Sequence, residues 1–201
     1  MHVIGITGGV GAGKTKILTY LSEHYSCRII LADGVANQLK EPGQKCYEEI
    51  VTLLGTQILK PDGTIDRLKM AERIFSDREL LRRVNEIIHP AVKEYILQAI
   101  EEERRRDKID FLFLEAALLI EEGYESIVDE LWYIYADEAV RAERLKANRQ
   151  YSDEKIQKIL RSQLSDAEYR AHCSTVIDNG VALEETYRQI EKKMGEYLWE
   201  K

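Results

Sequence analysis

The sequence predicts a three-layer α/β fold, in which helices cover both faces of a five-stranded parallel sheet. Short apolar runs at 3–6, 28–31, 110–114, 131–135 and 175–177 alternate with amphipathic helical stretches. This alternation is typical of a parallel sheet. The run at 111–114 is continuously apolar, as expected of a strand buried on both faces. A chain of 201 residues has room for one core with an insertion.

The first apolar run leads into a glycine-rich segment with the pattern G-x-x-x-x-G-K-[ST], and a helical pattern at 16–25 follows it. The segment reads Gly8-Gly9-Val10-Gly11-Ala12-Gly13-Lys14-Thr15. Glycines let backbone N–H groups converge on a polyphosphate, and the helix behind adds the positive end of its dipole. The alternative is a turn that only joins strand to helix. The order strand, loop, helix favours a nucleoside triphosphate site.

Two side chains of this segment carry specific chemistry. Lys14 supplies a mobile positive charge for the outer phosphates, and the Thr15 hydroxyl can bind Mg²⁺. Both residues stand where the pattern requires them.

Asp33 follows the second apolar run by two residues. Ligands bind at the carboxyl ends of parallel strands, so this carboxylate is a candidate to orient or deprotonate an acceptor hydroxyl. Its position suits an N-cap of a helix starting at Gly34 equally well. Both interpretations remain open on position alone.

Residues 34–108 interrupt the alternation and form a predicted helical insertion between two parts of the core, 1–33 and 109–201. Helical patterns occur at 48–54, 67–75 and 77–106, with turn signals at 41–43 and 60–63. Such an insertion is a natural place for a second substrate, and the alternative is a helical layer that serves only the core. His89-Pro90 is expected to end a helical turn, with His89 as a capping or packing residue and substrate contact as the second interpretation.

Glu115 closes the third predicted strand and resembles the carboxylate that helps to hold Mg²⁺ in phosphate-loop enzymes. It is longer than the usual Asp and can act through water.

Helices are predicted after Asp137 and Ser152, each of which is expected to be an N-cap. The region 141–170 is a candidate lid over the phosphates. Its candidate phosphate-binding cations are Arg141, Arg144 and Arg149, of which the last lies in the connector 148–150. The alternative is that these are ordinary exposed helix arginines.

Composition excludes several classes of function. A net charge of −7 argues against a broad nucleic-acid-binding face. The apolar runs fall short of the ~20 residues that span a bilayer, and the first strand leaves no room for a targeting peptide. Cys27, Cys46 and Cys173 lack metal-ligand spacing and are expected to be reduced thiols of a cytoplasmic protein. The absence of N-K-x-D and of a second phosphate loop disfavours a GTPase and a mechanical ATPase.

An ordered set of short segments resembles the dephospho-coenzyme A kinase family over nearly the whole chain. Residues 4–15 resemble the opening of that family, and 32–33 resemble its Asp-Ala-Asp element. The further matches are Asp66-Arg67 with Phe75, 85–90 ending in His89-Pro90, 118–121, Arg144-Leu145, Ser162-Gln163 and Val176-Ile177-Asp178-Asn179.

The resemblance implies a phosphate-loop fold of the nucleoside monophosphate kinase type. It implies ATP-dependent phosphorylation of the ribose 3′-hydroxyl of dephospho-coenzyme A with Mg²⁺. We expect the protein to be a monomer or a weak homo-oligomer. Residues 8–16, including Lys16, would contact ATP, and Asp33 would act on the hydroxyl. The insertion would hold the substrate, with Arg67 and His89 near it, and Arg141, Arg144 and Arg149 would belong to the lid or its flank.

Several positions depart from the family pattern. Leu31 replaces the first Asp of the Asp-Ala-Asp element, and the D-x-P-L-L-F-E segment reads 115–121, with Glu115 and Ala117 in place of its Asp and Pro. The lid arginine is shifted by one position, to Arg149. Two other functions therefore remain open. One is a kinase for another nucleoside or nucleoside monophosphate, and the other is a slow ATP-binding regulatory protein.

Overall fold

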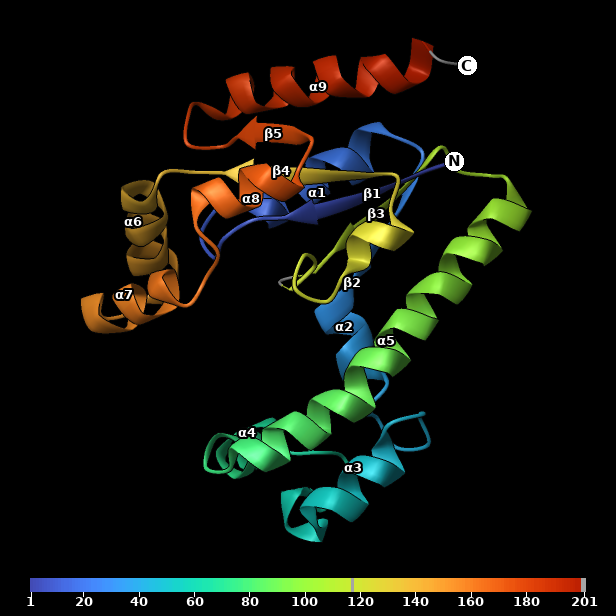
Figure 1. Cartoon of the computed structure of the whole chain (residues 1–201), viewed down its shortest axis with the longest axis vertical. Coiled ribbons are helices and arrows are strands. Elements are labelled where there is room, and N and C mark those ends of the chain that lie inside the picture. The colour runs from blue at the N-terminus through green and yellow to red at the C-terminus, as the bar shows by residue number, and fades with distance from the viewer. Residues whose placement is uncertain (117, 200–201) are drawn as a thin grey trace. The chain divides into compact units, whose positions relative to one another are not determined.

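The computed structural model of the chain describes residues 1–116 and 118–199, so Ala117 lies outside the described residues (Figure 1). The chain divides into two compact units: unit 1 comprises 1–29 and 107–201, and unit 2 comprises 30–106. In order, the elements are β1 (His2–Thr7), α1 (Lys14–His24), β2 (Cys27–Leu31), α2 (Ala32–Gln38), α3 (Tyr47–Leu54), η1 (Thr56–Ile58), α4 (Arg67–Phe75), α5 (Arg78–Arg106), β3 (Phe111–Glu115), η2 (Tyr124–Ile127), β4 (Glu130–Tyr135), α6 (Glu138–Arg149), α7 (Asp153–Arg161), α8 (Asp166–His172), β5 (Thr175–Asp178) and α9 (Leu183–Trp199).

The five strands form one sheet in the order β2-β3-β1-β4-β5. β1 is paired in parallel with β3 on one side, where Ile4 lies opposite Phe113, and with β4 on the other, where Ile6 lies opposite Trp132. The predicted five-stranded parallel sheet is therefore confirmed. Its central strand carries the glycine-rich segment at its carboxyl end, where ligands of such sheets bind.

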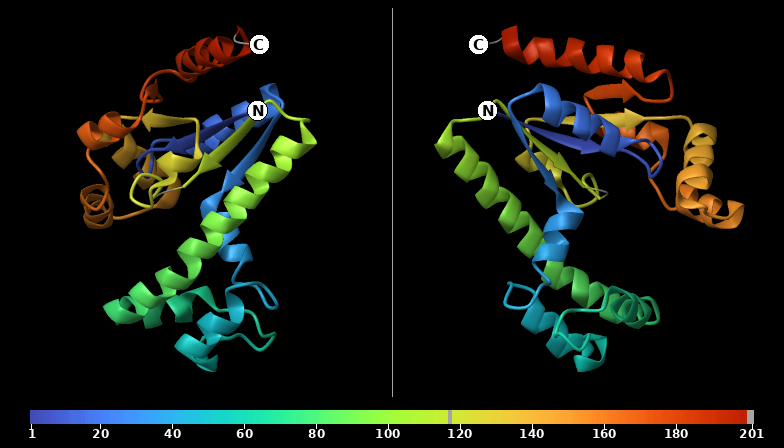
Figure 2. Two further views of the ribbon diagram at one scale, coloured as in Figure 1. Left: turned by 45° about the vertical axis from the view of Figure 1, so that its right-hand side comes forward. Right: turned by 180° about the vertical axis from the view of Figure 1, so that it is seen from behind.

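Alternate residues of the strands point to opposite faces of the sheet, and each face has its own helical cover. On one face, Ile4, Phe113 and Trp132 pack with buried residues of α1 and α9 in a single apolar cluster. On the other face, α8 lies against β4, where Tyr133 stacks on Tyr169 with ring centroids 4.6 Å apart (Figure 2). Helices on both faces make the predicted three-layer arrangement.

Glu130, the first residue of β4, joins three elements through its carboxylate. It accepts hydrogen bonds from Thr175 of β5 and Tyr197 of α9, and from Ser174 at 3.0 Å. Lys193 Nζ of α9 lies 3.2 Å from the same carboxylate. Burial raises the pKa of Glu130, but the hydrogen bonds together bring it below the usual value. The carboxylate therefore stabilises the fold in its ionised form.

Unit 2 is helical, as predicted for this part of the chain. α3 and α4 pack against α5, and their buried residues include Ile50, Leu54 and Met70. α5 confirms the helical stretch predicted at 77–106, but the expected end of a helical turn at His89-Pro90 is wrong, because the helix continues through Pro90 to Arg106. A proline costs the helix one hydrogen bond, and the helix continues where its apolar side is buried in the fold, as α5 is at Ile88, Ala91 and Val92.

All three cysteines are free thiols. Burial raises the pKa of the Cys173 thiol to about 12, which keeps it protonated and unreactive at neutral pH. A packing role suits this residue.

Glu130→Gln should lower the free energy of unfolding at pH 7 by about 1–3 kcal/mol, because a neutral amide binds Lys193 and the hydroxyl groups less strongly. The folded pKa lies below the unfolded one, so this stabilisation is complete above the unfolded pKa and is lost as the pH falls through the folded pKa. Below the ordinary value of 4.5, the wild type should therefore lose stability more steeply than the variant.

Urea denaturation between pH 7 and pH 3 measures both effects. Glu196→Gln is the matched control, because Glu196 contacts the same Lys193 but its side chain is 55% exposed. An exposed pair of this kind contributes less than about 1 kcal/mol. Identical pH profiles for the wild type and Glu130→Gln would contradict the assignment.

Candidate nucleotide-binding site

The glycine-rich segment forms a loop between β1 and α1. Gly11 and Gly13 have positive φ angles of 88° and 91°, which residues with a Cβ rarely adopt. Gly13 is the N-cap of α1, and no side chain among the described residues caps this helix. A helix that begins without a side-chain cap presents its first N–H groups and the positive end of its dipole to an anion. This local geometry suits phosphate.

Two side chains from later in unit 1 hold both backbone polar groups of Val10. The Val10 N–H donates to Gln163 Oε1 at 3.2 Å, and Arg141 Nε donates to the Val10 carbonyl at 3.1 Å. Arg141 also donates to the same Gln163 oxygen. Arg141 lies on α6 and Gln163 follows the end of α7. The three groups close a ring that ties the loop to both helices.

Arg144 and Asn179 hold the next part of the loop. Asn179 Nδ2 donates to the Ala12 carbonyl at 2.6 Å, and Arg144 Nη1 lies 3.3 Å from the same oxygen. Arg144 also donates to the backbone carbonyl of Asn179 at 2.7 Å. The Asn179 side chain is buried and accepts a hydrogen bond from the Thr186 hydroxyl at 3.3 Å. Two elements, α6 and the end of β5, therefore meet at one loop carbonyl.

These contacts explain the glycine at position 9 and add a second requirement for the glycine at position 13. A Cβ at Gly9 would lie 2.3 Å from the guanidinium carbon of Arg141, and one at Gly13 would lie 2.3 Å from Asn179 Nδ2. Both distances are too short for any side chain. The glycines thus let side chains approach the carbonyls of the loop from one side, which leaves the other side of the backbone for an anion.

Lys14 and Glu115 lie together beside the loop. Lys14 Nζ donates to the Gly8 carbonyl at 2.7 Å and lies 3.5 Å from Glu115 Oε1. Their side chains are 14% and 18% exposed, so the charges are only partly screened by water. Glu115 ends β3, as predicted. Thr15 lies in the exposed first turn of α1.

The donor atoms of Thr15 and Glu115 fit Mg²⁺, which prefers hydroxyl, carboxylate and phosphate oxygens. Among the described residues, no group of three or more His, Cys, Asp or Glu side chains is placed to hold a metal. A Mg²⁺ ion here would therefore share its ligands with the phosphates of a nucleotide, which is the usual arrangement for this ion.

The three predicted lid arginines differ in their surroundings. Arg141 and Arg144 are half-buried against the loop, whereas Arg149 is exposed. Arg149 is the last residue of α6 and does not lie in a connector, because the helix extends to its position. A hydrogen bond from Arg149 lowers the pKa of the Tyr151 hydroxyl, so its described contact is local. The predicted N-caps Asp137 and Ser152 are confirmed.

Asp33, Arg67 and His89 belong to unit 2. Asp33 is exposed in the first turn of α2, and Leu31 is the N-cap of that helix. The alternative interpretation of Asp33 as the cap of a helix beginning at Gly34 is therefore wrong. Arg67 is the exposed first residue of α4, and His89 is half-buried within α5.

Two residues of the site, Asn179 and Gln163, were not predicted to contact the loop. Asn179 directly follows β5 and so lies at the carboxyl edge of the sheet, a signal that could have identified it. Gln163 belongs to the Ser162-Gln163 segment that resembles the family, but nothing in that segment indicated a contact with the loop.

Comparison with known proteins identifies relatives over almost the full length. A family model described as dephospho-CoA kinase matches residues 2–185. A dephospho-CoA kinase of Carboxydothermus hydrogenoformans is 34% identical over 199 residues, covering 99% of this chain and 96% of the relative. A structure from Thermus thermophilus has a TM-score of 0.79 at 28% identity, covering 97% of both chains.

A second structural relative is a dephospho-CoA kinase from Campylobacter jejuni, with a TM-score of 0.72 and 22% identity over 96% of both chains. This likeness supports the fold. Among the described residues, none of the helices is both long and apolar enough to cross a membrane.

Gln163→Met should weaken ATP binding about tenfold, because the Val10 N–H and Arg141 both lose an acceptor and the loop is held less firmly. Gln163→Glu keeps an acceptor oxygen and should restore most of the affinity. Isothermal titration with ATP measures the dissociation constants, and thermal melts record stability.

Gln98→Met is the matched control, because Gln98 is exposed on α5, where it donates to Glu94 at 3.3 Å. It should leave ATP affinity unchanged. If Gln163→Met bound ATP as tightly as the wild type, the ring of contacts around Val10 would have no role in nucleotide binding.

Proposed function

The chain belongs to the dephospho-CoA kinase family, and we propose that it transfers the γ-phosphoryl group of ATP to the ribose 3′-hydroxyl of dephospho-coenzyme A. The products are coenzyme A and ADP. The acceptor oxygen forms a bond to the γ-phosphorus while the bond to the β,γ-bridging oxygen breaks. The hydroxyl proton passes to a base of the protein or to water.

The observation that supports this proposal most strongly is the uncapped N-terminus of α1 behind a glycine loop, with Lys14 beside it. Phosphoryl transfer needs little covalent chemistry from a protein, but it needs in-line positioning and cancellation of negative charge. The N–H groups of the loop hold the triphosphate, and Lys14 moves from the Gly8 carbonyl to the outer phosphates. Arg141 and Arg144 hold the loop and add positive charge at its base.

Residues 8–16 form the proposed ATP contact. Thr15 and Glu115 would hold Mg²⁺ together with the nucleotide, and the ion supplies charge neutralisation on the β- and γ-phosphates when bound. Glu115 also keeps Lys14 beside the loop before the nucleotide arrives. A kinase of a small-molecule metabolite and ATP is expected to act in the cytoplasm.

Asp33 is the proposed base or orienting carboxylate for the acceptor hydroxyl. It is exposed and does not cap α2, so its oxygens are available to a substrate. Leu31 stands two residues earlier, where the family pattern has another Asp, and Asp33 therefore acts without a second carboxylate from that element. Arg67 and His89 are proposed to contact the substrate within unit 2.

The proposed function is tested by a coupled assay of ADP release with five acceptor conditions: dephospho-coenzyme A, AMP, CMP, uridine and no acceptor. We expect strong turnover with dephospho-coenzyme A alone. Comparable turnover with a nucleoside or nucleoside monophosphate would favour a different small-substrate kinase. ATP binding without turnover of any acceptor would indicate a regulatory protein.

Asp33→Asn should lower kcat by a factor of about 100 or more, because the amide cannot take the hydroxyl proton. The KM for ATP should change little. The melting temperature should fall only slightly, because Asp33 is exposed and its interaction with the helix dipole is worth about 0.3–1 kcal/mol.

Glu48→Gln is the matched control, since Glu48 is an exposed acid in the first turn of α3. It loses the same interaction with a helix dipole and should keep full activity. Wild-type turnover in Asp33→Asn would rule out the proposed role of Asp33.

A further inference from the structure

The most exposed large apolar side chains among the described residues lie on one short helix of unit 2. In α4, Leu68 is 76% exposed and Phe75 is 79% exposed, whereas the other exposed side chains of this kind are 41–47% exposed. The two residues are seven apart, so they lie on the same side of the helix, with Ala71 between them. Exposed apolar side chains that gather in one place are typical of an interaction surface.

Cations flank this apolar row on both sides. By helical spacing, Arg67 lies on one flank, and Lys69 and Arg73 lie on the other. All three are exposed, and within the described part of the chain none of them makes an ion pair or a side-chain hydrogen bond. On the neighbouring helix α5, in contrast, Arg82 is paired with Glu86. We call the apolar row and its three cations the α4 ridge.

The position of α4 in its own unit is fixed by the opposite side of the helix. Met70 is buried there, and α4 packs against α5 and η1. The helix therefore cannot turn its exposed side toward the core of unit 2 without giving up this packing. The α4 ridge is available to a second molecule.

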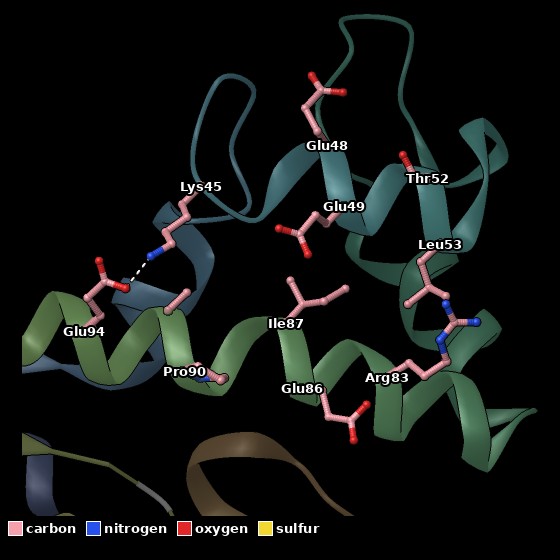
Figure 3. Close-up of a pocket in the computed structure, with 11 residues that line it drawn as sticks. Lys45, Glu48, Glu49, Thr52, Leu53, Arg83, Glu86, Ile87, Pro90 and Glu94 are labelled. Atoms are coloured by element: carbon pink, nitrogen blue, oxygen red, sulfur yellow. Dashed lines mark hydrogen bonds and ion pairs between the residues drawn. The ribbon is translucent and has the colours of Figure 1, made fainter.

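A groove of about 720 Å³ lies between α3 and α5 in the same unit, and we call it the α3–α5 groove. Its lining includes the apolar residues Leu53, Ile87 and Ala91, and Figure 3 shows Ile87 pointing from α5 toward α3. At one end of the groove, Lys45 from the loop before α3 is paired with Glu94 of α5. The groove can thus receive apolar side chains between two helices.

The charge of this groove is mainly negative. Glu48 and Glu49 of α3 are exposed lining residues, and they make no ion pair with any residue that the structure describes. Arg83 is a lining cation without an ion pair among the same residues, and it stands on α5. The α4 ridge has the reverse pattern, with three cations and one bordering acid, Glu72. The two surfaces are therefore complementary in charge.

We propose that the α4 ridge of one molecule docks in the α3–α5 groove of a second copy. The apolar row enters the groove, and the flanking cations Lys69 and Arg73 meet the free carboxylates of α3. Both surfaces belong to one compact unit, so every copy carries a ridge and a groove. Because two different surfaces meet, the contact joins copies head to tail. The interface is small and its affinity weak, and it does not depend on the proposed function.

Reversal of charge on each surface tests this assembly. Lys69→Glu with Arg73→Glu reverses the ridge, and Glu48→Lys with Glu49→Lys reverses the groove. Sedimentation equilibrium from about 1 to about 200 µM, the range suited to a weak interface, measures the average mass. We expect the mass of the wild type to rise with concentration and each variant alone to stay monomeric. An equimolar mixture of the two variants should associate again, because the ridge of each is opposite in charge to the groove of the other.

Lys158→Glu with Arg161→Glu is the matched control, since it reverses two exposed cations of α7 and should associate like the wild type. Phe75→Ser should raise the dissociation constant of the assembly about tenfold, because it removes an apolar side chain from the centre of the contact. Association should also weaken as the salt concentration rises. Thermal melts and titration with ATP show whether each variant is folded with an intact nucleotide site.

Several results would overturn the proposed assembly. One is a wild-type mass that stays at the monomer over the whole range, and another is association that neither reversal reduces. A mixture that stays monomeric although both variants fold has the same meaning. If Phe75→Ser associated normally but had a raised KM for dephospho-coenzyme A, the ridge would be a substrate contact instead. The proposed function stands or falls separately, on turnover of dephospho-coenzyme A by the wild type.

Discussion

The carbonyl groups of the glycine loop, and the side chains that satisfy them, are the constraint on which the rest of unit 1 depends. Arg141, Arg144, Asn179 and Lys14 together donate to the carbonyls of residues 8 and 10–12. A loop that bends its N–H groups toward an anion must turn carbonyls the other way, and a carbonyl without a partner would be costly in a partly buried place. These donors therefore stabilise the bent backbone of the loop before any nucleotide is present.

This arrangement also explains why an acidic chain can handle acidic ligands. The net charge of −7 is spread over a surface with many local ion pairs. The cations at the loop are held instead by neutral oxygens, such as the Asn179 carbonyl that accepts a hydrogen bond from Arg144. Neutral partners leave the positive charge of a guanidinium intact, whereas a carboxylate partner would cancel it. Of the loop cations, Lys14 has a carboxylate nearby, and that carboxylate belongs to the proposed metal site.

The sequence predicted the sheet and the loop well, because both leave local patterns. A continuous apolar run marks the strand at Phe111–Glu115, and the glycine spacing marks the loop. Element boundaries were harder. α2 begins at Ala32, two residues earlier than the capping interpretation of Asp33 required, because the chain leaves its extended conformation directly after Leu31. His89-Pro90 does not end a helical turn, because packing along α5 outweighs the loss of one hydrogen bond at Pro90. Contacts such as Gln163 with Val10 depend on tertiary structure and have no local signal.

The position of Asn179 has a consequence for how the protein comes into being on the ribosome. Its side chain donates to the Ala12 carbonyl across 167 residues of sequence. The glycine loop is translated early, but this hydrogen bond forms only after residue 179 has been translated. Long-range closure of this kind is slow, and a nascent chain that lacks Asn179 lacks one of the donors that hold the loop. The loop therefore gains its full set of supporting hydrogen bonds only when synthesis is almost finished.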